Sequence, residues 1–161
     1  MSKTQTIPMT VADPEVAAGT AQFLSPVVLG LQALGVNGKQ AHWNVRGSNF
    51  IAIHELLDQV VAHAQASADE AAERIVALGL PIDARVSTVA AKTQATAVAA
   101  GFEQWESTIA AIVADMDAVL VDVQAAIDGL DEIDLTSQDV AIGIKASLEK
   151  DRWFLSAHLA G

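Results

Sequence analysis

The chain is 161 residues long, which is enough for one domain with a sizeable core. Its 20 acidic and 9 basic residues give a net charge of −11, and such a field attracts cations and disfavours binding to nucleic-acid backbones. With no cysteine, the chain has no disulfides and no thiolate metal sites, and its alanine-rich, aromatic-poor composition predicts an all-α fold.

We expect residues 1–13 to be a flexible N-terminal segment ahead of one helical domain over residues 14–161. The segment has no charged region followed by an apolar one, so no signal peptide is indicated and a cytoplasmic protein is expected. Residues 16–38 carry no charge and are long enough to span a bilayer. Because Gln22, Pro26 and several glycines interrupt them, we interpret them as a buried core helix and expect no membrane partner.

The first helix is predicted to end near Trp43, and its beginning is open between two interpretations. Either Ser25 is an N-cap with Pro26 at the first helical position, or Pro26 kinks a helix that begins near Glu15.

The second helix follows a turn over residues 46–49. Asn49 is its expected N-cap, and the helical pattern reaches Leu78. Gly79 and Pro81 then stop it, because glycine readily ends a helix and proline cannot continue one.

Residues 80–94 have no continuous helical pattern, so they predict a long connection with one short helical turn around residues 87–91. A third helix follows, in which apolar side chains recur at steps of three and four, and Gly129 is expected to end it. Its apolar positions are Phe102, Trp105, Ile109, Ile112, Met116, Val119 and Val123.

Thr136 or Ser137 is the expected cap of a fourth helix that runs through Trp153 towards Leu159. The spacing of Trp105 and Trp153 predicts that both lie in the core. Four helices with one long connection, between the second and third, predict a ferritin-like four-helix bundle with a crossover. Cytokine-type bundles need two long connections and fit less well.

Four potential metal ligands lie on one face of the second helix. With His54 set at 0°, a helix that turns about 100° per residue places Asp58 at about 40°, Asp69 at about 60° and Glu73 at about 100°. Asp58 and Asp69 are nevertheless about 16 Å apart along the helix axis. One chain therefore cannot bring both pairs to a single ion.

A two-fold axis would resolve this separation. If two copies of the helix cross antiparallel near His63 and Ala64, the His54/Asp58 pair of one chain faces the Asp69/Glu73 pair of the other. Such a dimer has two identical sites, each built from both subunits. His42, at the end of the first helix, could add a second imidazole to each site.

This ligand set suits ions such as Fe²⁺, Mn²⁺ or Zn²⁺, because imidazole and carboxylate bind borderline and hard cations. The alternative is a solvated helix face, which acidic residues at four-residue spacing usually mark. Asp69 and Glu73 favour the metal, since two like charges one turn apart cost stability unless a cation neutralises them. His63 lies off the stripe and is interpreted as a packing or interface residue.

Two motif comparisons are negative. His54 to Asp58 begins like the zinc-protease pattern H-E-x-x-H, but Asp58 stands where the second histidine belongs. No E-x-x-H pair exists in the sequence, so a di-iron centre inside one bundle cannot form.

The stretch KQAHWNVRGSNFIAIHELLD (residues 39–58), followed by DEAAERIVALG (residues 69–79), resembles the Dps family of ferritin-like mini-ferritins. The resemblance implies a hollow dodecamer with ferroxidase centres at its two-fold interfaces. It carries the family's ligands onto five positions here and places Trp43 beside the site. These ligands are His42, His54, Asp58, Asp69 and Glu73.

The resemblance also implies a function. Such proteins oxidise Fe²⁺, commonly with hydrogen peroxide, and store a ferric mineral, which protects the cell against oxidative damage. Their three-fold pores are acidic, and the candidates here are Asp131, Asp134 and Asp139, for which a solvated helix N-terminus is the alternative.

Two other functions remain open from the sequence. A metal-dependent hydrolase could use the same His/carboxylate site to activate water. A DNA-compacting protein would need the basic tails that DNA-binding members carry, whereas Lys3 is the only basic residue before Lys39 and the net charge is −11.

Overall fold

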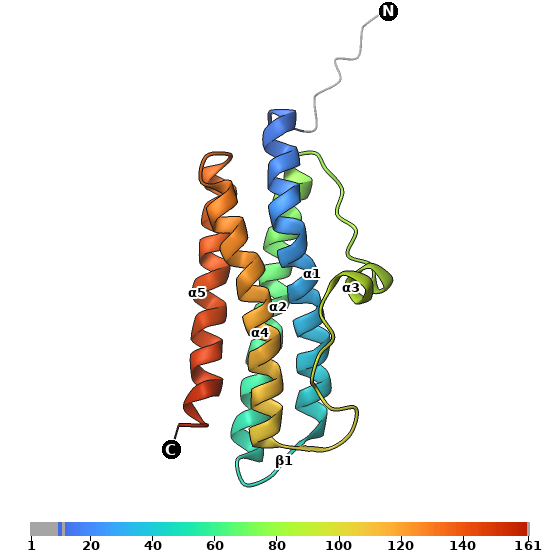
Figure 1. Cartoon of the computed structure of the whole chain (residues 1–161), viewed down its shortest axis with the longest axis vertical. Helices are drawn as coiled ribbons and strands as arrows, with labels where there is room; N and C mark the ends of the chain where they lie inside the picture. The colour runs from blue at the N-terminus through green and yellow to red at the C-terminus, as the bar shows by residue number, and fades with distance from the viewer. Residues whose placement is uncertain (1–9, 11, 161) are drawn as a thin grey trace, which may run out of the picture.

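The computed structural model describes Thr10 and residues 12–160. Within them the chain forms five helices and one pair of two-residue strands, drawn in Figure 1. In chain order these are α1 Pro14–Asn44, β1 Val45–Arg46, α2 Phe50–Ala77, α3 Val86–Lys92, β2 Glu103–Gln104, α4 Trp105–Leu130 and α5 Leu135–Ala157.

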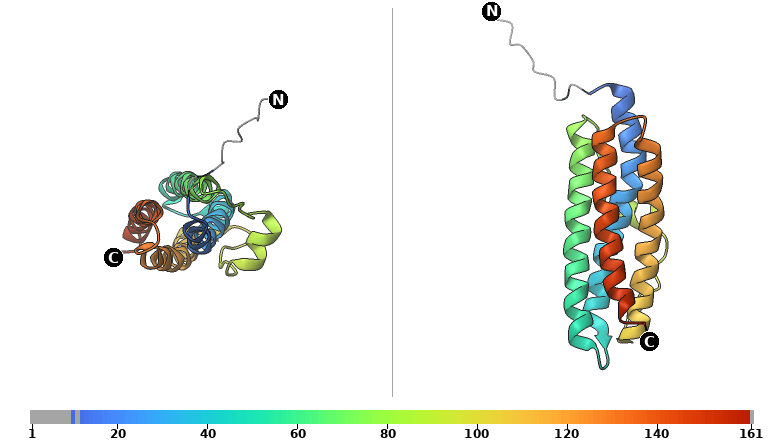
Figure 2. Two further views of the ribbon diagram at one scale, coloured as in Figure 1. Left: turned by 90° about the horizontal axis from the view of Figure 1, so that it is seen from above. Right: turned by 90° about the vertical axis from the view of Figure 1, so that its left-hand side faces the viewer.

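The four long helices form one bundle, and α3 lies outside it. Helix α1 packs most extensively on α2 and also on α4, while α4 packs on α5. The connection from α2 to α4 carries α3 along the outer side of α1, as Figures 1 and 2 show. The predicted all-α bundle with a long crossover and a short helix in it is confirmed.

Helix α1 begins much earlier than Pro26. Asp13 is its N-cap, with a side-chain oxygen that accepts from the Glu15 amide at 2.8 Å, and Pro14 occupies the first turn. Pro26 therefore lies inside the helix, which decides between the two interpretations of its beginning. Among the described residues, α1 is the one helix long and apolar enough to cross a membrane, yet it packs between α2 and α4 as a core helix.

The turn between α1 and α2 is tied to the end of the crossover. Gly47 has a φ of +114°, a conformation that favours glycine, and Trp105 packs against it so closely that a side chain would clash. Next to this turn, β1 pairs in parallel with β2. The Arg46 guanidinium also lies 3.2 Å from the centre of the Phe102 ring. Asn49 occupies the N-cap position of α2, but its side chain makes no capping hydrogen bond.

Helix α2 ends as predicted, at Gly79. This glycine has a φ of +94°, and the amides of Gly79 and Leu80 bond back to the carbonyls of Val76 and Ile75. These bonds satisfy carbonyls that the helix end would otherwise leave open. Thr10 packs directly against Gly79. Residues 1–9 and 11, which make up most of the expected flexible segment, lie outside the described residues.

Three local predictions were wrong. Gly129 does not end α4: it lies in the last turn, where the ring of Phe23 occupies the space of a side chain. The cap of α5 is Asp134 rather than Thr136 or Ser137. Trp153 is 64% exposed in the protomer and is not in the core, because it lies on the outer face of α5.

Candidate metal centre

Helix α2 has an apolar side that packs in the bundle and a second side that carries the candidate ligands. Small residues such as Ala64 and Ala68 alternate with branched ones on the buried side, which lets α1 approach closely. Asp58, Asp69 and Glu73 lie on the exposed side. The predicted stripe of ligands therefore faces away from the core.

His42 and His54 hold each other through two reciprocal hydrogen bonds. The Nδ1 atom of His42 lies 2.8 Å from the carbonyl oxygen of His54, and Nδ1 of His54 lies 2.9 Å from the carbonyl oxygen of His42. The rings are stacked, with centroids 3.6 Å apart. Because a carbonyl oxygen only accepts, each Nδ1 donates its N–H, and Nε2 of each ring is the nitrogen that could bind a cation.

Asp58 completes this half of the site. Its carboxylate oxygen Oδ1 lies 3.4 Å from Nδ1 of His42 and forms an ion pair with the ammonium of Lys39. The hydrogen bond from Lys39 lowers the pKa of Asp58, so the carboxylate is charged at neutral pH. The structure thus brings together three predicted ligands, His42, His54 and Asp58, as one half-site.

Asp69 and Glu73 form the other half. Both are exposed on α2, and the structure does not bring them to the His42 end of the helix. Within the described part of the chain, no three His, Asp or Glu side chains are arranged to hold one ion. The described part of a single protomer therefore contains no complete metal site, and the five predicted ligands are divided between the two ends of α2.

The two remaining histidines are not at this centre. His63 points to α5, where Nδ1 lies 2.9 Å and 3.0 Å from the two oxygens of the buried Asp151. This agrees with its interpretation as a packing residue. His158 follows α5 and is half-buried beside Trp153, Phe154 and Glu55.

Comparisons with known proteins agree with the residue pattern. A model of the ferritin-like domain matches residues 31–161. The DNA protection during starvation protein of Mycolicibacterium smegmatis is 32% identical over 143 residues, which cover 89% of this chain and 78% of that protein. The protein of the same name from Agrobacterium fabrum is 34% identical over 122 residues and covers 75% of each chain.

Among solved structures, Dps from Microbacterium arborescens in its high iron form is 77% identical to this chain. The TM-score is 0.92, and the match covers 93% of this chain and 98% of that one. The chain belongs to the Dps family of ferritin-like proteins. This confirms the resemblance seen in the sequence, and it associates the chain with a family whose general role is iron storage and DNA protection.

Two residues beside the half-site of this Dps chain were missed by sequence reasoning. The ring of Phe50 lies 5.1 Å from that of His54, on which it packs, and Lys39 neutralises Asp58. Their spacing contained a signal: Phe50 lies one helical turn before His54, and Lys39 lies three residues before His42.

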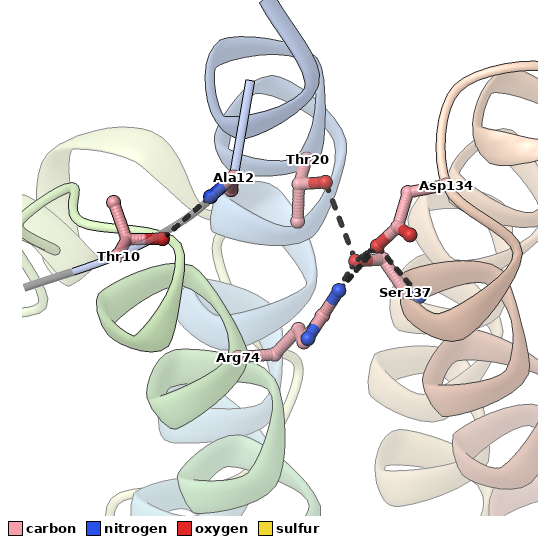
Figure 3. Close-up of polar contacts among 6 residues, drawn as sticks. All are labelled: Thr10, Ala12, Thr20, Arg74, Asp134 and Ser137. Atoms are coloured by element: carbon pink, nitrogen blue, oxygen red, sulfur yellow. Dashed lines mark hydrogen bonds and ion pairs between the residues drawn. The ribbon is translucent and has the colours of Figure 1, made fainter. Parts of the chain in front are cut away.

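The three acidic pore candidates differ in their surroundings. Asp134 is bound by Arg74, whose Nη2 lies 2.6 Å from Oδ2, and it accepts hydrogen bonds from the amide and hydroxyl of Ser137 (Figure 3). Arg74 also donates to the Ser137 hydroxyl, at 2.9 Å. Asp131 and Asp139 are exposed. The carboxylate of Asp134 is therefore already occupied inside the protomer.

Proposed function

We propose that this protein oxidises Fe²⁺ at two identical sites, each shared between two copies of the chain. The observation that carries the proposal is the division of the candidate ligands between the two ends of α2, with His42 of α1 added at one end. His42, His54 and Asp58 converge at one end, and the Asp69/Glu73 pair lies alone on the same face. A second, antiparallel copy would bring unlike halves together.

The charges of the two halves support this pairing. One half contains two imidazoles, Asp58 and the cation of Lys39, whereas the other contributes the two exposed carboxylates of Asp69 and Glu73. The assembled set is rich in anionic oxygen, which favours Fe³⁺ over Fe²⁺ and so favours oxidation. Hydrogen peroxide is the proposed oxidant: two ferrous ions each lose one electron, and peroxide takes both electrons and two protons as its O–O bond breaks to give two water molecules.

We further propose that the subunits form a closed cage, a dodecamer, that stores the ferric product. Acidic residues at the end of the bundle, Asp131 and Asp139, are the candidates for a cation path into it. Asp134 would have a structural role next to that path. Its carboxylate is bound by Arg74 of α2 and by Ser137, and these contacts hold the beginning of α5 in place. A native mass about twelve times that of the chain would agree with this assembly.

The shared site has a direct test by complementation. The variants Asp58→Ala and Glu73→Ala should each lose oxidation of Fe²⁺, because every site lacks one ligand. In a dimer that contains one chain of each, one site lacks both ligands and the other is intact. A random mixture assembled from unfolded subunits should therefore recover about one quarter of the wild-type sites.

Both outcomes are informative. Recovery in the mixture, measured as ferric absorbance after peroxide addition, supports sites made from two chains. If the mixture stays as inactive as its components, while wild type treated identically is active, the sites are not shared. Asp117→Ala is the matched control. It removes an exposed carboxylate of α4 that pairs with Arg152 of α5, and it should retain full activity.

DNA compaction is not part of this proposal. The net charge of −11 per chain would repel phosphate backbones, and repeated copies in a cage would multiply that field. We expect no shift of duplex DNA on a gel at low salt, where electrostatic binding is strongest.

A further inference from the structure

A cavity of about 320 Å³ lies between α1, α4 and the crossover segment that begins at the end of α3. Its volume is within the range of small-molecule sites. The described residues that line it belong to α1, α4 and the crossover and none to α2, so the cavity is separate from the candidate metal centre. Small residues on the two facing helices leave this space open, and they are Gly30, Ala33, Ala114 and Ala118.

Two carboxylates of α4 line the cavity, those of Asp115 and Asp122. Because they are seven residues apart, they share one face of the helix and are separated by about 10 Å along its axis. Ala118 and Val119 lie between them and line the same cavity. The cavity therefore has two anionic groups with an apolar stretch between them.

The carboxylate of Asp115 is held in position by two neutral donors. Its Oδ2 atom accepts hydrogen bonds from Nδ2 of Asn37 at 2.9 Å and from the hydroxyl of Thr96 at 2.7 Å. Asn37 belongs to α1 and Thr96 to the crossover, so this carboxylate links the three segments that surround the cavity. Neither bond uses Oδ1 or neutralises the charge, so Oδ1 can accept from a cationic donor.

Asp122 is half-buried, and this burial raises the pKa of its carboxyl. The physical cause is the loss of hydration, which a cation beside the carboxylate would offset. Lys92 also lines the cavity, but neither Asp115 nor Asp122 forms an ion pair within the described part of the chain. With two carboxylates against one ammonium, the cavity favours a cationic ligand.

We propose that this cavity binds a short aliphatic diamine, with one ammonium at Oδ1 of Asp115 and the other at the carboxylate of Asp122. Two charged hydrogen bonds of about 2.8 Å each take up about half of the separation along α4, and the remainder suits a chain of about three or four methylene groups. These methylene groups would lie against Ala118 and Val119, where their burial contributes to binding. A single metal ion cannot reach both carboxylates, and a monoamine can use only one of them.

Calorimetric titration of the metal-free protein with 1,4-diaminobutane tests this site, and no step of the test depends on iron oxidation. We expect saturable binding of one diamine per chain. Butylamine has the same aliphatic chain but one ammonium, so it should bind about ten-fold more weakly or less, because one charged hydrogen bond is lost. A titration without saturable diamine binding, or equal affinities for the two amines, would overturn the proposal.

Substitution of one carboxylate locates the bound diamine. Asp122→Asn should weaken binding of 1,4-diaminobutane by about ten-fold or more. Asp117→Asn is the matched control, because it makes the same change of charge on α4 at a residue that pairs with Arg152 and does not line the cavity. It should keep the wild-type affinity. If both variants lose affinity equally, the diamine responds only to the net charge of the chain and the site is wrong.

Two further variants test the space between the carboxylates and the role of Lys92. Ala118→Phe keeps both carboxylates but fills the cavity, so it should abolish diamine binding, and unchanged binding would contradict the proposal. Lys92→Met removes a competing ammonium and should tighten binding by about two- to five-fold. Weaker binding in Lys92→Met would overturn the assignment of a diamine and indicate a ligand that also carries an anionic group.

Discussion

The two halves of helix α2 are built differently. At the N-terminal half, His54 is held by the stacked ring of His42 and by two reciprocal hydrogen bonds to backbone carbonyls. At the C-terminal half, Asp69 and Glu73 are exposed side chains one turn apart. The two imidazole rings of the N-terminal half are held in place without a bound ion. The two carboxylates of the C-terminal half repel each other, and we expect a cation and a partner chain to fix their positions. If the proposed shared sites form, the difference predicts that assembly and metal binding reinforce each other.

The largest expected effect is the loss of the pre-formed half. His42→Ala removes a proposed ligand, the stacking partner of His54 and the hydrogen bond to the carbonyl oxygen of His54. We expect iron oxidation to fall about 100-fold or more, and the free energy of unfolding to fall by about 1–3 kcal/mol. Stopped-flow absorbance and urea denaturation measure the two effects. His158→Ala should change neither, and a His42→Ala variant with the wild-type rate would contradict the assignment.

The second prediction concerns Arg74, which lies next to Glu73 on α2 and contacts α5. Arg74 follows Glu73 directly but points to α5, where it binds Asp134 and Ser137. Arg74→Met leaves these partly buried groups without their cation and should lower the free energy of unfolding by about 1–3 kcal/mol. Arg85→Met removes an exposed ion pair with Asp83 and should leave the free energy of unfolding unchanged within error. Equal effects of the two would refute a structural role for Arg74.

The contribution of the Asp134 carboxylate to the free energy of unfolding should depend on pH. Burial opposes ionisation of Asp134, but hydrogen bonds from Ser137 and Arg74 outweigh it and lower the pKa of the carboxyl. A group with a lowered pKa in the folded state stabilises the protein above its unfolded pKa and loses that effect as the pH falls. The stability difference between wild type and Asp134→Asn should thus be constant above about pH 5 and shrink below about pH 4.

A smaller effect is expected at Lys39, which pairs with the ligand Asp58 in the metal-free chain. A divalent cation must compete with this ammonium for the carboxylate. Lys39→Met should therefore tighten binding of Zn²⁺ or Co²⁺, used as redox-inert probes, by about two- to five-fold, which is the range for an exposed ion pair. Titration calorimetry of chelator-treated protein measures the change, and weaker binding would show that Lys39 helps to hold the site.

The smallest expected effect concerns the repulsion between Asp69 and Glu73 at the C-terminal half of α2. Glu73→Gln removes one of two like charges a turn apart, so the metal-free protein should gain about 0.2–0.5 kcal/mol of stability. In saturating metal the sign should reverse, because a ligand is lost. Thermal unfolding with and without metal tests both signs. A loss of stability in both conditions would mean that Glu73 has a partner other than a cation.

Much of the fold could be predicted because helix geometry is local. Steps of three and four in the apolar residues predicted α4, and the expected cap Asn49 and the stop at Gly79, which has a positive φ, bounded α2. Local patterns failed where a second helix decided the outcome. Gly129 looked like a helix end but accommodates Phe23 from α1, and Trp153 has core spacing on a face that the bundle leaves uncovered.

By itself, the sequence determined that four candidate ligands lie on one stripe of α2 that is too long for a single ion, since rotation and rise per residue are the same in every α-helix. Only the tertiary structure decided how those residues are held. The packing of α1 on α2 brought the carbonyl of each histidine to Nδ1 of the other, and the approach of α5 turned Asp134 towards Arg74. Such contacts depend on the rotation and depth at which two helices meet, and no spacing along one chain contains that information.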